Sequence, residues 1–189
     1  MPPIKGRKVL IIGASTSIGC ARLRIWTSTS HFQTRTRSPT PPKDWLSANP
    51  NRCVTSHVAK LGGDDAEAIL ERLFTEATVD GPLDHIIMTA GAPGMRPLAE
   101  IDVPYLVSQA MLPVMPSMLI GKLAHKYIQR HWASSITFTG GRIAEKPVPG
   151  WAIAAGFAGG LPALTKAFAL ELAPLRYNHV SPGATDTEM

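Results

Sequence analysis

The sequence predicts an α/β domain built on a doubly wound parallel sheet. Short apolar runs that have the character of buried strands alternate with helical segments along most of the 189 residues, which is the element order of a βαβ fold. Several of these runs end in glycine, as a strand does when it leads into a tight turn. The length suits one hydrophobic core, so we expect residues 1–189 to form one domain.

The first half of the chain supplies three expected strands and one helix. KVLIIGAS (8–15) is a short apolar run that ends at a glycine turn, and RCVTSHVAKL (52–61) contains a second expected strand. DDAEAILERLFTEAT (64–78) predicts a helix that Asp64 can cap, with Glu67 at its third position. One apolar face recurs along it: Ile69, Leu70, Leu73, Phe74 and Ala77. DGPLD (80–84) predicts a turn before the strand HIIMTAG (85–91).

The second half continues the alternation. Residues 97–131 are expected to form one or two helices, interrupted near Pro113 and Pro116 because proline cannot donate a helical hydrogen bond. SSITFTGG (134–141) predicts a strand that ends in a glycine pair. A helix follows from about Ala152 or Gly160 to Leu172, and then YNHV (177–180) predicts the last strand before the loop SPGATDTEM (181–189).

Residues 20–50 do not fit this order. ARLRIW (21–26) alternates polar and apolar residues, which is a strand period where a helix should follow the first glycine turn. The remainder is rich in Ser, Thr, Pro and Arg, a composition typical of loops. We therefore expect an irregular segment at about 20–50, which is long for a loop in a compact domain.

The composition is that of a globular protein, with 44% hydrophobic and 17% charged residues. The net charge of +5 would suit an anionic ligand, but no basic stripe with interleaved aromatic residues predicts nucleic-acid binding. Cys20 and Cys53 are too few for a disulfide framework. The amino terminus has too short an apolar run for a signal peptide, and AMLPVMPSMLIGKLA (110–124) is too short to span a bilayer. We expect a cytoplasmic protein with no membrane contact.

A glycine-rich turn, GASTSIG (13–19), directly follows the first strand. Glycine lets the backbone approach a pyrophosphate there, and the start of the next helix would offer free N–H groups to it. This turn, DHIIMTAG (84–91), ITFTGG (136–141), TKAFALELAP (165–174) and NHVSPGATDTEM (178–189) together resemble the short-chain dehydrogenase/reductase family. The resemblance covers residues 8–19 and about 54–189, in the family's order. It implies a Rossmann-like sheet that binds NAD or NADP.

The resemblance also implies which residues hold the cofactor. In the family's turn motif G-x-x-x-G-x-G the first and last glycines match, and Ser17 replaces the middle one. The family's N-N-A-G matches at Ala90 and Gly91, beside the ribose, and its P-G-x-x-x-T matches near the nicotinamide. The expected cofactor-binding residues are Gly13, Ser15, Ser17, Ile18, Gly19, Ala90, Gly91, Pro182, Gly183 and Thr187.

Two of the family's cofactor signals do not match. Lys60 stands where the family usually has an aspartate near the adenine, and the strand that would read the ribose falls within residues 20–50. Arg35, Arg37 or Lys43 would meet the 2′-phosphate of NADP, but they also fit a solvated basic loop. The sequence therefore leaves NADP or NAD open.

The family's catalytic tyrosine and lysine have no counterpart in this sequence. The family places them as Y-x-x-x-K on one face of a helix, where the ammonium lowers the pKa of the phenol that exchanges a proton with the substrate. An ungapped match puts Ala154 and Ala158 there, and a shift of three residues gives Phe157 and Leu161. The family's serine falls on the pair Gly140–Gly141, with Thr139 as the nearest hydroxyl. We therefore predict no residue as catalytic by resemblance.

Other polar residues near this motif fit a solvated surface better than a chemical role. Arg142, Glu145 and Lys146 would rim the pocket, where Trp151 could line it, and Lys166 lies too far along the helix. The scattered histidines, such as His125 and His131, have no metal-ligand spacing on a helix face, so no metal site is expected.

The resemblance implies an NAD(P)-dependent oxidoreductase that acts on an unknown small carbonyl or alcohol through a divergent active site. Because members of the family commonly pair through the helix that ends here at about Leu172, it also implies a homo-oligomer. Two alternatives remain: a redox-silent relative that binds a cofactor or ligand or catalyses isomerisation or cyclisation, and a non-functional truncated product. The family continues past the position of Met189 with another helix and strand. We therefore expect a sheet that is incomplete relative to the family.

Overall fold

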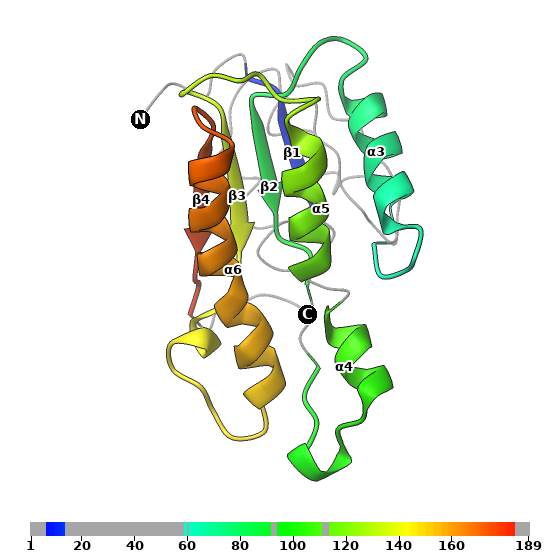
Figure 1. Cartoon of the computed structure of the whole chain (residues 1–189), viewed down its shortest axis with the longest axis vertical. Coiled ribbons are helices and arrows are strands. Elements are labelled where there is room, and N and C mark those ends of the chain that lie inside the picture. Colours follow the sequence, from blue (N-terminus) through cyan, green and yellow to red (C-terminus); the bar gives the residue numbers. More distant parts are fainter. Residues whose placement is uncertain (1–6, 14–58, 60, 92–93, 111–113, 184–189) are drawn as a thin grey trace, which may run out of the picture.

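A computed structural model of the chain describes residues 7–13, 59, 61–91, 94–110 and 114–183. Its centre is a parallel sheet in the order β1 (Val9–Ile12), β2 (His85–Met88), β3 (Ser135–Thr139) and β4 (Arg176–Val180) (Figure 1). Each pair runs in register, with Ile12 opposite Met88 at the end of the first pair. The predicted α/β class with a parallel sheet is confirmed.

Three helices lie side by side on one face of this sheet: α3 (Ala66–Ala77), α5 (Val114–Ala124) and α6 (Ala152–Glu171) (Figure 1). Each precedes a strand of the sheet, β2, β3 and β4 in turn, and runs antiparallel to it, as a βαβ connection requires. Three shorter elements, η2 (Leu98–Glu100), α4 (Val103–Ala110) and η3 (Arg142–Ala144), lie beyond the carboxyl ends of the strands, where the first half of α6 joins them. Only one layer of helices thus falls within the described residues.

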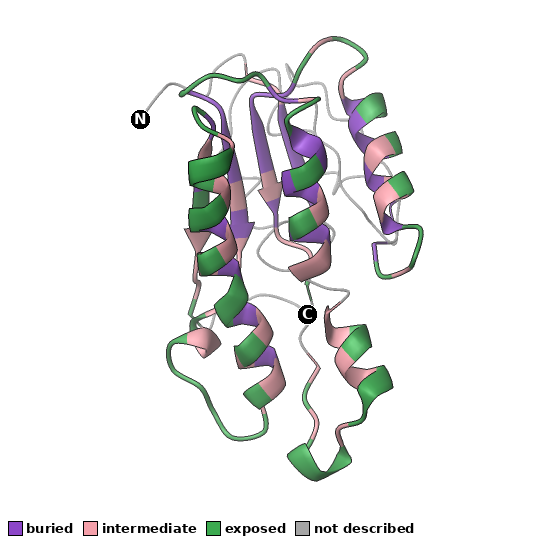
Figure 2. Ribbon diagram, viewed as in Figure 1, coloured by how far each residue is buried: buried purple, intermediate pink, exposed green. Residues whose placement is uncertain are grey.

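The core fills the space between the sheet and these helices. The largest completely buried side chains come from the strands and from the inward faces of α3, α5 and α6: Phe74, Phe138, Leu10, Leu70, Leu83, Ile86, Met88, Ile120, Leu123, Ile136 and Leu161. In Figure 2 the buried residues follow the strands and one stripe of each of these helices. No residue of α4 is buried.

Helix α5 packs closely on α6 because Gly121 has no side chain. The Phe168 ring of α6 covers this glycine so closely that a Cβ atom there would lie 2.2 Å from the ring. The same ring contacts the Phe138 and Tyr177 rings, with centroids 6.3 and 5.4 Å away. On the other side of α5, Lys122 pairs with Glu67 of α3.

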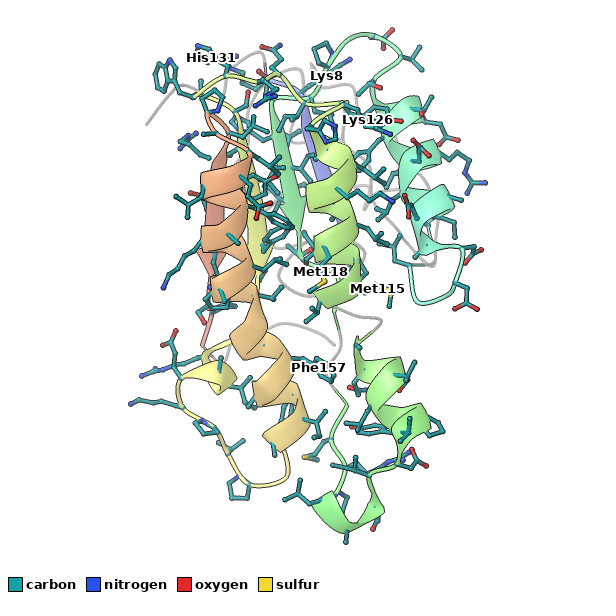
Figure 3. The ribbon with its side chains drawn as sticks, viewed as in Figure 1. Lys8, Met115, Met118, Lys126, His131 and Phe157 are labelled. Atoms are coloured by element: carbon teal, nitrogen blue, oxygen red, sulfur yellow. The ribbon has the colours of Figure 1, made fainter. Side chains whose placement is uncertain are left out.

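A polar cluster holds the amino ends of the strands, the edge marked by Lys8, Lys126 and His131 in Figure 3. The Asp84 carboxylate is buried and accepts hydrogen bonds from Arg7 Nη1 at 2.8 Å and from the backbone N–H of Lys8 at 2.7 Å. The neighbouring His85 ring is also buried, with Nδ1 2.9 Å from the Ser135 hydroxyl. These contacts stabilise the edge of the sheet opposite the glycine turns.

The structure corrects several expected helix boundaries. The N-cap of α3 is Asp65, not Asp64, and it makes no side-chain capping bond, so Glu67 is the second helical residue. Pro116 does not interrupt a helix but lies within α5. The helical region also ends at Ala124, short of His131.

Helix α6 begins at Ala152, the earlier of the two expected starts, and it continues through Pro162. A proline in a helix interior removes one hydrogen bond and crowds the preceding turn. The helix changes direction near its middle (Figure 1). The second half of α6 therefore packs on the sheet, and the first half extends past the carboxyl ends of the strands.

Two apolar stretches, Val103–Ala124 and α6, are long and apolar enough to cross a bilayer by length and composition alone. The expectation that the apolar stretch at 110–124 is too short does not hold for the longer stretch that contains it. Core helices of soluble proteins satisfy the same criteria. Here α5 and the second half of α6 pack against the sheet.

Two further expectations fall outside the described residues. The second expected strand, within 52–61, lies almost entirely there, and the irregular segment at about 20–50 lies there completely.

Candidate active site at the carboxyl ends of the strands

The carboxyl ends of the four parallel strands meet at one edge of the sheet. Ligands of open parallel sheets bind at this edge, where the chain leaves each strand for the next helix. Glycines lie at or just after the ends of three of the strands: Gly13, Gly91, Gly140 and Gly141. Backbone without side chains is therefore concentrated at one edge.

Gly13 brings the end of β1 against the end of β2. Its φ of +95° lies in the region that favours glycine, and a Cβ atom there would lie 2.2 Å from the backbone nitrogen of Ala90. Ile12 accepts hydrogen bonds through its carbonyl oxygen from the N–H of Thr89 at 2.8 Å and of Ala90 at 3.1 Å. Only glycine fits at position 13, so the turn is fixed by the approach of Ala90.

The ends of β3 and β4 are joined in a similar way. The N–H of Gly140 donates to the carbonyl oxygen of Val180 at 2.9 Å, and the N–H of Arg142 donates to that of Pro182 at 3.0 Å. These two bonds fix the residues after β4 beside the glycine pair.

The His179 imidazole occupies the space beside Gly140 that a side chain would otherwise fill. A Cβ atom on Gly140 would lie 2.5 Å from His179 Nε2 and 3.5 Å from a methyl group of Leu161 on α6. His179 Nε2 is buried and has no hydrogen-bond partner among the described residues. Burial lowers the pKa of this histidine from its usual value, and the nearby charge of Glu145 opposes part of the shift.

Ser181 lies two residues further along and repeats this pattern. Its hydroxyl oxygen is also buried and finds no partner in the described part of the chain. Buried polar groups in folded proteins are nearly always hydrogen-bonded, so each exception requires an explanation. Two such atoms lie within three residues at the carboxyl end of β4.

Helix α6 presents an apolar stripe to this region. Ala154, Ala158, Leu161 and Thr165 are buried and recur at helical spacing, and the Thr165 hydroxyl donates to the carbonyl oxygen of Leu161 at 2.7 Å. Neither alanine brings a proton-exchanging group. Phe157 projects from the same half of the helix on the side of α4 (Figure 3), and Lys166 is exposed as expected.

The segment before α4 forms its own polar cluster. Gln109 Oε1 accepts from the N–H of Gly94 at 2.6 Å, and the Arg96 guanidinium lies 4.2 Å from the centre of the Tyr105 ring. The Tyr105 hydroxyl is buried without a partner among the described residues. A Cβ atom on Gly94 would lie 2.8 Å from that hydroxyl and 3.0 Å from the Gln109 amide, so the phenol faces its own loop.

The charged residues on the expected rim are solvated. Arg142, Glu145 and Lys146 are exposed on and after η3, and Trp151 is half-buried at the start of α6. No group of three or more His, Cys, Asp or Glu residues with metal-binding geometry occurs among the residues described.

The structure brings half of the expected cofactor residues together at one edge. Gly13, Ala90 and Gly91 meet at the ends of β1 and β2, and Pro182 and Gly183 follow β4. The other expected residues lie outside the described ranges: Ser15, Ser17, Ile18, Gly19 and Thr187. No motif in the sequence pointed to the buried atoms of His179 and Ser181, although a histidine in a strand next to the P-G motif was visible.

Comparison with known proteins gives consistent matches. A family model described as the SDR-like Rossmann domain matches residues 7–189. The short-chain dehydrogenase/reductase ATR9 of Stachybotrys chlorohalonatus is 38% identical over 199 residues, covering all of this chain and 78% of that protein. The short-chain dehydrogenase/reductase malC of Malbranchea aurantiaca is 31% identical and covers 97% of this chain and 74% of its own length.

Solved structures match over nearly the whole chain. The structure of the MalC Reductase/Diels-Alderase from Malbranchea aurantiaca superimposes with a TM-score of 0.87 at 30% identity, covering 97% of this chain and 75% of that one. A short chain dehydrogenase from Burkholderia cenocepacia, solved in complex with NADP, gives a TM-score of 0.83 at 21% identity, covering 98% of this chain and 77% of that one. The second likeness supports the fold alone.

Proposed function

Because the chain belongs to the short-chain dehydrogenase/reductase family, we propose that it is an oxidoreductase that binds a nicotinamide dinucleotide across the carboxyl ends of its strands. The observation that carries this proposal is the bare backbone at that edge, where Gly13 packs on Ala90 and the glycine pair lies beside Pro182. The buried, unpartnered atoms of His179 and Ser181 at the same edge fit a site that takes up a polar ligand.

The residues proposed to hold the cofactor are those that the family resemblance assigns. Gly13 and the turn after it would face the pyrophosphate, Ala90 and Gly91 the ribose, and Pro182 and Gly183 the nicotinamide amide. We propose NADP or NAD. When bound, the dinucleotide supplies or accepts the hydride, and the protein positions the acceptor and excludes water.

The proposed enzyme is a divergent member that works without the family's phenol. Ala154 and Ala158, which stand at the matching positions of α6, offer no proton. Hydride transfer to a neutral carbonyl carbon leaves an alkoxide that must be stabilised and protonated, whereas transfer to a cationic iminium carbon leaves a neutral amine. The missing phenol therefore lowers the rate of reduction of the carbonyl more than that of the iminium, because a well-placed general acid accelerates the reaction by about 10²- to 10⁴-fold.

A second candidate function is a redox-silent reaction in the same pocket. Its specific support is the apolar stripe of α6, which presents Ala154, Ala158 and Leu161 where a reductase of the family would present its acid. A relative 30% identical in sequence carries the description Reductase/Diels-Alderase, and this makes cyclisation the first alternative chemistry to examine.

Several wider properties are also proposals. The substrate is a small molecule, nucleic acid and membranes are not partners, and the protein is cytoplasmic. A homo-oligomer would cover the exposed side of α6, which carries small residues and Leu170, a side chain that is 83% exposed.

The first experiment is a calorimetric titration with NADPH and then with NADH. We expect heat from at least one of them, and Gly19→Val should abolish it because a branched side chain would occupy the path of the pyrophosphate. Neither heat nor a thermal shift at millimolar cofactor would overturn the proposal.

The second experiment restores the family's motif. Ala154→Tyr combined with Ala158→Lys should raise ketone reduction by about 10²-fold or more if the acid is the missing element. No gain with the cofactor bound would instead favour the redox-silent alternative. Fast ketone reduction by the unchanged chain would show that it already holds a proton donor.

A further inference from the structure

The carboxyl end of β4 carries two buried polar side-chain atoms for which the described residues provide no partner. His179 Nε2 and the Ser181 hydroxyl oxygen have no partner within the described ranges. Leaving a buried donor or acceptor unpaired costs about 1–3 kcal/mol. Two such atoms, two residues apart in the sequence at the edge where parallel sheets bind ligands, would gain partners from a bound polar ligand.

The position of the imidazole is fixed by its neighbours. Tyr177 contacts the Phe168 ring of α6 and therefore faces the helix layer, and His179 faces the same side because side chains alternate along a strand. Gly140 lies beside the ring on β3, and a methyl group of Leu161 on α6 borders the same space. The ring is therefore held between the sheet and the first half of α6.

The neighbours also set the charge of this imidazole. The contacts from β3 and α6 are apolar, and the charged group that acts on the ring is Glu145, which follows η3. Burial outweighs this carboxylate and lowers the pKa of the ring. At neutral pH the ring is thus uncharged, with one N–H donor and one bare nitrogen.

We propose that His179 is the side chain that contacts the reacting heteroatom of the substrate, with Nε2–H donating a hydrogen bond to a carbonyl oxygen and the Ser181 hydroxyl beside it. This inference rests on the proposed function for the hydride. The carbonyl carbon gains a hydride from the reduced nicotinamide, which is oxidised, and the C=O π electrons move to the oxygen. His179 stabilises that oxygen while it takes a proton from water, and the product is an alcohol.

A neutral imidazole suits this role because it can polarise a carbonyl without giving up its proton. Four other described polar side chains near this edge are less suited to contact the carbonyl oxygen. Arg142, Glu145 and Lys146 are exposed to solvent, and the Tyr105 hydroxyl faces Gly94 and Gln109 within its own loop. His179 therefore occupies the space that a side chain at position 140 would otherwise enter.

The test compares two acceptors with NADPH: acetophenone, a neutral ketone, and N-methyl-3,4-dihydroisoquinolinium, a cyclic iminium salt. His179→Leu should lower kcat/KM for the ketone by about 10²-fold, the typical cost of one oxyanion donor. The loss for the iminium salt should be much smaller because no oxyanion forms. His179→Gln keeps an N–H donor and should restore part of the ketone activity.

The matched control is His125→Gln, an exposed histidine just after α5 at the opposite edge of the sheet. His125→Gln should leave the activity toward both the ketone and the iminium salt unchanged. Tyr105→Phe tests whether the Tyr105 phenol, instead of His179, contacts the carbonyl oxygen. Equal losses for ketone and iminium salt in His179→Leu, or a ketone loss in Tyr105→Phe alone, would overturn the inference. NADPH affinity measured by calorimetry should be unchanged in His179→Leu.

A second readout needs no turnover. In protein with ¹⁵N-labelled histidine, the His179 signal is identified by its disappearance in His179→Gln, and acetophenone is then added with and without NADP⁺. We expect the Nε2 resonance to shift when the ketone is present, with His125 unmoved. An unmoved His179 signal would overturn this inference alone, whereas a shift without any NADPH binding or hydride transfer would overturn the proposed oxidoreductase and leave the contact standing.

Discussion

Replacing Gly13 by alanine tests whether the close approach of β1 and β2 is what requires glycine. The substitution carries two separate costs. A φ of +95° is unfavourable for alanine by about 1–3 kcal/mol. The added Cβ atom would also lie 2.2 Å from the Ala90 nitrogen, more than 1 Å short of ordinary contact, and overpacking of this kind adds about 1–3 kcal/mol.

Gly81 provides a matched control because it isolates the first cost. Its φ is +112°, and a Cβ atom there would meet nothing within 4 Å. Gly81→Ala should therefore carry only the conformational cost. In urea unfolding, a slope of about 2 kcal/mol per M converts the second cost into a lower midpoint for Gly13→Ala than for Gly81→Ala, by about 0.5–1.5 M.

The measurement is the midpoint of urea unfolding, monitored by circular dichroism. The two midpoints can be compared if the dependence of the unfolding free energy on urea has the same slope in both variants. Equal midpoints for the two variants would refute the reasoning, since they would show that Ala90 moves aside without cost. A lower midpoint for Gly81→Ala would refute it more strongly.

Three other outcomes are expected. Gly121→Ala should lower the free energy of unfolding by about 1–3 kcal/mol because its Cβ would overlap the Phe168 ring, and adding Phe168→Leu should recover part of the loss in the same urea assay. Tyr177→Phe should leave the free energy of unfolding unchanged or raise it by as much as about 3 kcal/mol, because the buried Tyr177 hydroxyl has no partner in the described part of the chain. A large loss of stability would contradict this. Burial lowers the pKa of both His85 and His179, so the unfolded chain binds more protons than the folded one at mildly acidic pH. The free energy of unfolding should therefore be fully present above about pH 6.5 and fall as the pH drops through the folded pKa values. Replacing both rings by leucine should flatten this pH dependence in thermal melts.

The strands and most helices could be predicted because their patterns are local. The apolar runs before Gly13, Gly91 and Gly140 predict buried strands that end in turns, and α3 has a clear apolar face. The helix boundaries could not be predicted as well, because they depend on contacts between residues that are far apart in the sequence. Pro162 would end an isolated helix, yet α6 continues through it because both halves are held by packing on other elements.

The site was harder to predict than the fold. A glycine at 140 gave no sign that a histidine from the next strand fills the space beside it, since Gly140 and His179 meet only when β3 and β4 pair in register. The residues assigned to the cofactor by motif could be placed along the sheet edge, whereas His179 and Ser181 stand out only once burial and missing partners are known.

The packing at Gly140 also couples two positions of this site during evolution. Positions 140 and 179 border the same space, so a side chain at 140 would require the ring at 179 to turn away or be lost. A change at one of these two positions is therefore expected to be accompanied by a change at the other.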